Sequence, residues 1–228
     1  MKITALIALY HSGLFIKSKI ESILSQTAFE DTTFVFLNCQ DKDKESEHII
    51  PLLKKYKNIK HILFTSHLNL YDSWNAGIGI TSSDYIVNYN ADDQWHSEYL
   101  AKCASYLDRH HDYSIVSSQV LITDKPNQVY PNWNHVWSRM VVDTYPSTTA
   151  GPCPMWRRTM HAKYGYFGSY RVIGDARFWE AMYAGQEKFG LIKEDLVLYY
   201  MSPTSLERRR DGEGNSFRDL DLAQDNHK

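Results

Sequence analysis

Apolar runs and helically spaced apolar positions alternate along the first half of the chain. The near-continuous apolar run at 3–10 predicts a buried strand, and Ile16, Ile20 and Ile23 then recur at the spacing of one helix face. Strands separated by helices predict an α/β fold, a Rossmann-like sandwich of three layers around a mostly parallel central sheet. Further strands are predicted at 34–37, 61–64, 84–89 and 113–122, and helices at 49–56, 71–80 and 97–109, the last capped by Ser97.

The regular alternation stops at 124–127. From there to 154 the chain is rich in Pro, Trp, Asn and Thr, which is typical of loops that cover a site. The charged stretch beyond 203 predicts a flexible tail over 206–228, so we expect one domain over 1–205 with halves at 1–124 and 125–205. The second half is predicted to contain a short helix at 157–164, a turn at 165–170, a helix at about 175–184 and a strand at 191–200.

Composition excludes several classes of protein. The 228 residues, 43% of them hydrophobic, suffice for one well-buried domain. The 25 Lys and Arg against 27 Asp and Glu give a net charge of −2, which predicts neither nucleic-acid binding nor adhesion to an anionic membrane. Cys39, Cys103 and Cys153 form no CxxC pair, so we expect a reducing, cytoplasmic location. No segment approaches bilayer-spanning length, so membrane contact is expected to be peripheral or through a lipid-linked substrate.

Candidate chemistry begins at Asp92 and Asp93. An apolar strand runs directly into these two adjacent acids, and both are costly to keep charged side by side. A hard cation such as Mg²⁺ or Mn²⁺ would resolve this conflict, because it takes oxygen ligands and leaves other positions to substrate phosphates and water. The alternative is a solvated turn at the strand end, in which Asp93 caps the following helix.

Ligands of open parallel sheets bind outside the carboxyl ends of the strands. No GxGxxG follows the first strand and no GxxxxGK[ST] occurs, so dinucleotide binding and a P-loop are both disfavoured. The absence of a G-x-S-x-G context argues against a serine hydrolase. A nucleotidyltransferase would need a Gly-rich, basic loop after the first strand, which 11–14 does not provide.

Four segments in order resemble the nucleotide-sugar half of family-two inverting glycosyltransferases with the GT-A fold. They are 3–10, 20–27, 69–78 and 89–96. The segment at 151–200 is similar to the acceptor half of that family, so the resemblance covers about 1–205. It implies that 1–124 binds a nucleoside diphosphate sugar and that 125–205 binds the acceptor.

The resemblance implies roles for individual residues. Asp92 and Asp93 occupy the position of the DxD-type motif, which binds Mn²⁺ or Mg²⁺ on the donor diphosphate, and Asp93 is expected to be the direct ligand. The metal would stabilise the leaving nucleoside diphosphate. Donor contacts are expected at Leu9, Tyr10, Asn38, Trp74, Asn75, Asn90 and Asp92.

Several positions depart from the family pattern. Asn38 stands where many members have acids that hold the base and ribose, and Trp74 stands where an Arg often lies near the donor. Ser202 ends a segment that lacks both the Arg and the His of a YRxH-like motif. The missing Arg at position 74 predicts that Arg157, Arg158 or the arginines of the tail neutralise part of the diphosphate charge, or that donor binding is weaker.

Asp175 is the candidate catalytic base. The segment 173–179 resembles the ED motif of the family, with Gly174 in place of Glu, and Asp175 matches the acid that deprotonates the acceptor. A carboxylate in a partly desolvated pocket suits that task. The alternative is a helix N-cap, a position that an Asp after Gly would satisfy well.

Together these residues predict a metal-dependent inverting glycosyltransferase, hexosyltransferase-like and suited to polysaccharide biosynthesis. It would move a sugar from a nucleoside diphosphate to a hydroxyl of a glycan or lipid-linked acceptor. The competing hypothesis is a GT-A-like domain that holds a nucleotide or glycan without transferring it. The sequence leaves open the sugar, the base, the linkage and the oligomeric state.

Overall fold

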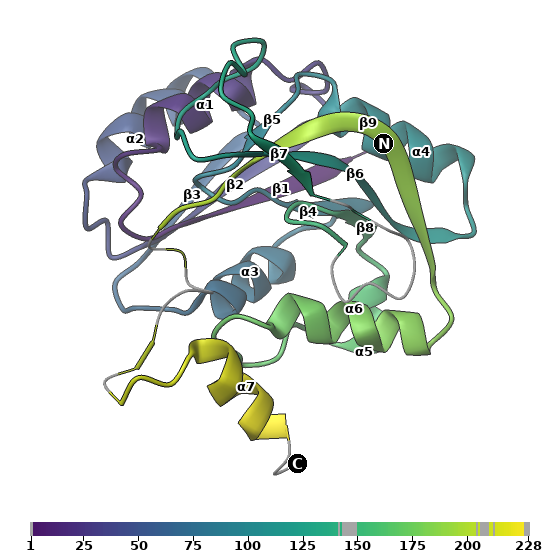
Figure 1. Cartoon of the computed structure of the whole chain (residues 1–228). Coiled ribbons are helices and arrows are strands. Elements are labelled where there is room, and N and C mark those ends of the chain that lie inside the picture. The colour runs from purple at the N-terminus through teal and green to yellow at the C-terminus, as the bar shows by residue number, and fades with distance from the viewer. Residues whose placement is uncertain are drawn as a thin grey trace.

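The computed structural model describes residues 2–140, 142, 150–203, 205, 210–211 and 213–225. Figure 1 shows a central sheet with helices on both faces, which confirms the predicted α/β class. The strands are β1 (Ile3–Leu9), β2 (Thr32–Cys39), β3 (Ile59–Phe64), β4 (Tyr85–Asn88), β5 (Gln94–Trp95), β6 (Tyr113–Thr123), β7 (Ser138–Met140), β8 (Met155–Arg157) and β9 (Lys188–Tyr200). The helices are α1 (Ile16–Leu24), α2 (Glu45–Lys55), α3 (Leu70–Gly79), α4 (Tyr99–Arg109), α5 (Met160–Tyr164), α6 (Gly174–Ala184) and α7 (Phe217–Asp225).

The described strands form one sheet in the order β3-β2-β1-β4-β8-β6-β9-β5, with β7 added beside β6. Strands β3, β2, β1 and β4 are parallel neighbours, and β6 pairs in parallel with β9. Strand β8 is antiparallel to both β4 and β6. The carboxyl ends of the first four strands therefore lie along one edge of the sheet, where the candidate residues follow them.

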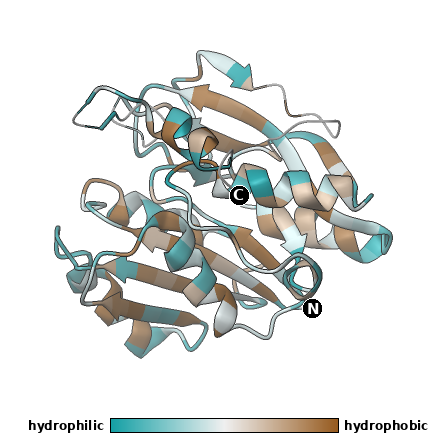
Figure 2. Ribbon diagram, turned by 90° about the horizontal axis from the view of Figure 1, so that it is seen from below, coloured by the Kyte–Doolittle hydropathy of each residue, from teal (hydrophilic) through white to brown (hydrophobic). Residues whose placement is uncertain are grey.

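Alternate side chains of each strand enter two separate apolar layers. Along β1, Ile7 packs in the upper layer (the upper core), beneath α1, α2 and α4, whereas Leu6 packs in the lower layer, against α3, α5 and α6. In Figure 2 the strands are predominantly hydrophobic, while the helices carry both hydrophobic and hydrophilic positions. Burial on both faces explains why these strands are near-continuous apolar runs in the sequence. No helix among the described residues is both long and apolar enough to cross a lipid bilayer.

Several predicted boundaries are wrong. Helix α4 is preceded by Glu98 rather than capped by Ser97, and Glu98 makes no side-chain cap hydrogen bond. The loop-rich stretch at 124–154 contains β7, and Arg157 ends β8 instead of beginning a helix. The strands β7 and β8 have only three residues each, too few for a period-two pattern to be recognised in the sequence.

The prediction of a flexible tail is also wrong for the part of 206–228 that the structure describes. Residues 217–225 form α7, and Asp221 in this helix is fully buried. The charged composition suggested solvation, but the burial of a charge depends on partners elsewhere in the chain, which composition does not show. The domain boundary at 205 itself stays a prediction.

The buried His161 in the lower layer predicts that the folded protein loses stability as the pH falls. Trp156 Nε1 donates to His161 Nε2 at 2.9 Å, and His161 Nδ1 lies 2.9 Å from the Gly165 carbonyl oxygen, so the ring is neutral with its proton on Nδ1. Burial lowers the pKa of His161 below its ordinary value of 6.5. Protonation of the ring would break the bond from Trp156.

The unfolded chain therefore binds a proton at His161 at a higher pH than the folded chain does. The stabilisation that the neutral His161 ring contributes is fully present above pH 6.5. It is lost as the pH falls from 6.5 through the lower pKa that His161 has in the folded protein, by at most about 1.4 kcal/mol per pH unit. Urea unfolding of the wild type and of His161→Gln between pH 8 and pH 5 would measure it. A free energy of unfolding that falls equally with pH in both proteins would contradict this prediction.

Candidate active site

Exposed aromatic rings lie at the carboxyl ends of β1 and β3. The Tyr10 ring is 40% exposed, and its centroid lies 4.6 Å from the ring of His67 and 4.6 Å from the ring of His11. His11 Nδ1 lies 3.2 Å from Asp43 Oδ1, in the loop after β2. Exposed aromatic faces flanked by polar groups suit the stacking of a nucleobase.

The loops after β1 and β2 are joined by a buried carboxylate. Glu45 is fully buried and accepts hydrogen bonds from Ser12 N at 2.8 Å and from Asp43 N at 3.2 Å. A Cβ on Gly13 would lie 2.7 Å from the Asp43 side chain, so only glycine allows this approach. These contacts fix the Tyr10 loop relative to the neighbouring strand end.

Two predicted donor contacts have side chains in the interior. Leu9 is 1% exposed and belongs to the upper core. Asn38 is fully buried, and its Nδ2 donates to Asp41 Oδ1 at 2.7 Å and to Ser46 Oγ at 3.3 Å. The structure gives these residues structural partners, and their contact with a donor stays a prediction.

The two acids that follow β4 have different surroundings. Asp93 is fully buried, and its Oδ2 accepts from Asn90 Nδ2 at 3.1 Å while its Oδ1 accepts from Tyr200 N at 3.2 Å. Asp92 keeps partial exposure, and no described side chain hydrogen-bonds to its carboxylate. Burial, and then the neighbouring Asp92, raise the pKa of Asp93 to about 8, and burial also raises the pKa of Asp92.

Sequence reasoning missed a buried lysine beside these acids. Lys19 in α1 is fully buried, donates from Nζ to the Asp93 carbonyl oxygen, and lies with Nζ 3.1 Å from the centroid of the Tyr89 ring. Burial lowers the pKa of Lys19 to about 7. Its position between Ile16 and Ile23 on the inward face of α1 was the available signal.

The end of β9 packs against the same acids. The backbone amide of Tyr200 contacts Asp93, the Tyr200 ring lies 5.9 Å from that of Phe15, and Ser202 is 9% exposed. Residues 199–202 therefore lie at the candidate site. This is the segment that stands in the position of the YRxH-like motif.

Helix α3 directs its tryptophan into the core. Trp74 is 2% exposed and packs in the lower layer, with its ring 5.6 Å from Phe167. Asn75 binds the backbone of Phe167 on both sides, through Nδ2 to the carbonyl at 2.9 Å and through Oδ1 to the amide at 3.0 Å. Both side chains have structural partners here, and donor contacts by Trp74 and Asn75 stay predictions.

Asp175 lies in the first turn of α6, opposite the start of α3. Tyr71 OH donates to Asp175 Oδ1 at 2.9 Å, and the same oxygen accepts from Ala176 N at 2.9 Å. The N-cap of α6 is Ile173, so the alternative in which Asp175 is the cap is wrong. A Cβ on Gly174 would lie 2.8 Å from the Tyr71 ring, so the glutamate expected there would collide with Tyr71 in this arrangement.

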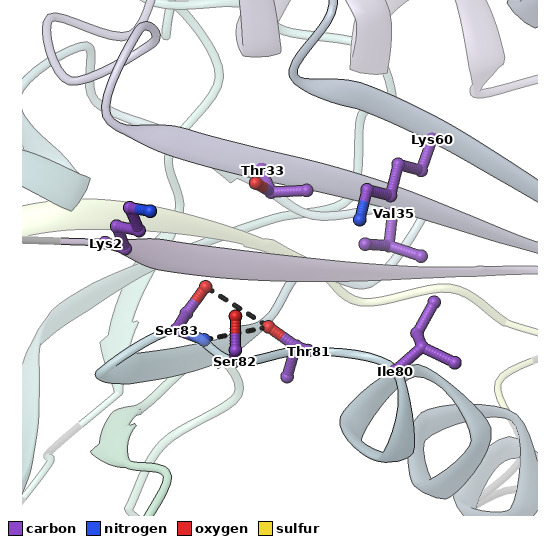
Figure 3. Close-up of a pocket in the computed structure, with 8 residues that line it drawn as sticks. All are labelled: Lys2, Thr33, Val35, Lys60, Ile80, Thr81, Ser82 and Ser83. Atoms are coloured by element: carbon purple, nitrogen blue, oxygen red, sulfur yellow. Dashed lines mark hydrogen bonds between the residues drawn. The ribbon is translucent and has the colours of Figure 1, made fainter.

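The two arginines suggested for the diphosphate lie at the opposite edge of the sheet. Arg157 donates to the Leu107 carbonyl, and Arg158 donates to the carbonyl of Ser83 just before β4 begins. The arginines at 208 and 209 lie outside the described residues. A cavity of about 140 Å³ occupies that opposite edge; it is lined by Lys2, Thr33, Val35, Lys60, Ile80, Thr81, Ser82 and Ser83 (Figure 3).

The acids fit a hard divalent cation through Asp92 rather than Asp93. Asp93 is fully buried and each of its carboxylate oxygens accepts a hydrogen bond from the protein, whereas Asp92 is partly exposed and no described side chain hydrogen-bonds to its carboxylate. Within the described part of the chain, no group of three or more His, Cys, Asp or Glu side chains is gathered to hold a metal ion. The expectation that Asp93 is the direct ligand is not favoured by this geometry.

A curled, mostly parallel sheet with acids at the carboxyl end of its fourth strand defines the GT-A class of fold. The sequence model of the family described as Glycosyl transferase family 2 matches residues 4–172. The chain therefore belongs to glycosyl transferase family 2.

Three known proteins illustrate the similarity. S. aureus TarS 1–349 in complex with UDP-GlcNAc superposes with a TM-score of 0.69 at 16% identity, over 94% of this chain and 60% of that one. The mannosyltransferase PcManGT from Pyrobaculum calidifontis, in complex with GDP-Man and Mn²⁺, gives 0.69 at 11% identity, over 90% and 58%. An uncharacterized glycosyltransferase of Haemophilus influenzae is 26% identical over 120 residues, which is 53% of this chain and 37% of that protein. The chain thus spans less than two thirds of the length of each of these relatives.

Proposed function

We propose that this chain transfers a sugar from a nucleoside diphosphate to a hydroxyl of a glycan or lipid-linked acceptor, with inversion and with a divalent metal. The observation that carries the proposal is the gathering of three kinds of group at one edge of the sheet. These are the exposed aromatic pair Tyr10 and His67, the partly exposed acid Asp92, and Asp175 held by Tyr71. Base stacking, diphosphate binding and proton removal each require one of them.

In this mechanism Asp175 accepts the proton of the acceptor hydroxyl. The hydroxyl oxygen forms a bond to the anomeric carbon while the bond from that carbon to the diphosphate oxygen breaks on the opposite face, which inverts the configuration. Mn²⁺ or Mg²⁺, when bound, supplies positive charge to the leaving diphosphate. Asp92 would hold the cation, and Asp93 would fix the turn on which Asp92 lies through Asn90 and Tyr200.

Tyr10 and His67 would stack the base, and Asn90, next in the chain to the acid turn, would face the ribose. The UDP of one structural relative and the GDP-Man and Mn²⁺ of another support a nucleoside diphosphate as ligand. A cytoplasmic place in polysaccharide biosynthesis, with peripheral membrane contact through a lipid-linked acceptor, is part of the same proposal.

Calorimetric titration with UDP and with GDP, each with and without Mn²⁺, tests the proposal. We expect one nucleotide to bind more tightly with the metal, and the matching nucleotide sugar to release nucleotide slowly to water. A nucleotide that binds without any hydrolysis or transfer would favour the alternative of a binding domain. Failure of both nucleotides to bind would contradict the proposal and the alternative that the domain holds a nucleotide.

A further inference from the structure

The C-terminal helix α7 contributes a buried acid to the segment that leads into α6. Asp221 is fully buried, and its carboxylate accepts hydrogen bonds from three consecutive backbone amides: Arg171 at 2.9 Å, Val172 at 2.8 Å and Ile173 at 3.2 Å. A buried carboxylate is costly unless it is paired, and three charge-assisted bonds from amides supply that pairing.

These bonds act where α6 lacks a cap of its own. Ile173 is the N-cap of α6 and makes no side-chain cap hydrogen bond, and the Asp221 carboxylate, from a helix 48 residues later, instead holds the three amides at 171–173 that lead into the helix. A carboxylate near the first turn also interacts favourably with the helix dipole. The segment that leads into α6 is therefore held by α7.

Further contacts hold α7 in this place. Tyr170 OH donates to Asp225 Oδ1 at 2.6 Å, and Arg177 of α6 forms an ion pair with Asp225 at 2.7 Å. The guanidinium of Arg171 lies 5.9 Å from the Phe217 ring. Helix α7, yellow at the bottom of Figure 1, thus spans both the approach to α6 and its first turns.

Asp175 follows Ile173 by two residues and has little freedom to adjust. Gly174 packs against the ring of Tyr71, and Tyr71 OH donates to the Asp175 carboxylate. A shift of the backbone at 171–173 would therefore move the carboxylate relative to the sheet edge. A displacement of a catalytic group by about 1 Å can lower the rate of an enzyme about 100-fold, because the reacting atoms must stay aligned.

We propose that Asp221 is a positioning residue for Asp175, so that α7 helps to hold the catalytic base on the acceptor side. The inference rests on the proposed function in one respect, the role of Asp175 as base. The family match ends at residue 172, so α7 lies outside the matched region.

The test compares Asp221→Asn with Asp219→Asn, a change on the exposed side of the same helix. Asparagine offers one acceptor oxygen and turns an NH₂ group toward the donor amides. We expect faster amide hydrogen exchange at 171–177 in Asp221→Asn, unchanged affinity for UDP with Mn²⁺, and a kcat for hydrolysis of the UDP or GDP sugar lower by about 10- to 100-fold. In an Asp175→Asn background, Asp221→Asn should cause no further loss.

Wild-type exchange or wild-type kcat in Asp221→Asn would overturn the proposal, as would an equal further loss in the Asp175→Asn background. If Asp221→Asn fails to fold, Tyr170→Phe provides a milder loosening of α7. It should accelerate exchange at 171–177 and lower kcat without changing UDP affinity, and unchanged exchange would again overturn the proposal. If the wild type hydrolyses no donor, the proposed function fails, and the exchange measurement alone then decides whether Asp221 holds this segment.

Discussion

Replacing Asp175 by asparagine is expected to lower kcat by about 10²- to 10⁴-fold while the affinity for UDP stays that of the wild type. The amide cannot take a proton from the acceptor, but it still accepts the hydrogen bond from Tyr71. The side chain keeps its shape, so the loss falls on the proton transfer alone. Steady-state transfer or donor hydrolysis, with calorimetry for UDP and Mn²⁺, measures the two quantities separately.

Asp31→Asn is the matched control, because Asp31 is exposed and precedes β2 at the opposite edge of the sheet. It should leave both kcat and UDP affinity unchanged. Normal turnover in Asp175→Asn would remove Asp175 from the proton transfer. A parallel loss of UDP affinity would instead assign it to the donor site.

Asp92→Asn and Asp93→Asn are expected to fail in different ways. Loss of the Asp92 carboxylate should weaken Mn²⁺-dependent binding of UDP and lower metal-dependent turnover by about 10²- to 10³-fold, because charge on the leaving diphosphate is no longer countered. Asp93→Asn should instead lower the free energy of unfolding by about 1–3 kcal/mol. The Asp93 carboxylate accepts from Asn90 through one oxygen and from the Tyr200 amide through the other, and an asparagine side chain has only one acceptor oxygen for the two donors.

Titration of the two variants with UDP, with Mn²⁺ or with the chelator EDTA, and denaturant unfolding of both would separate these effects. The assignment of the metal to Asp92 is wrong if Asp93→Asn alone abolishes metal-dependent binding. Turnover that survives EDTA unchanged in the wild type would remove the metal from the mechanism altogether.

Much of the fold could be predicted because it depends on local patterns. The strand β1 and the helix α1 are long enough for their apolar periodicity to be recognised, and the parallel order follows from their alternation. The three-residue strands β7 and β8 carry no such period. Their place in the sheet depends on partners far along the chain.

The candidate site was predictable only as a set of strand ends. The sequence predicted that Asp92 and Asp93 follow a strand and that Asp175 lies near the start of a helix, and they lie after β4 and in the first turn of α6. It could not show which of the two neighbouring acids is buried. Lys19 and Asp221 were missed because a charged residue in a helix is usually solvated. Their burial depends on a carbonyl and on backbone amides that only the folded chain brings near.

The close approach of Gly174 to the Tyr71 ring constrains how this lineage can change. A side chain at position 174, glutamate included, would need a smaller residue at 71 or a displaced α3. Homologues that carry an acid at this position should therefore differ at both sites together.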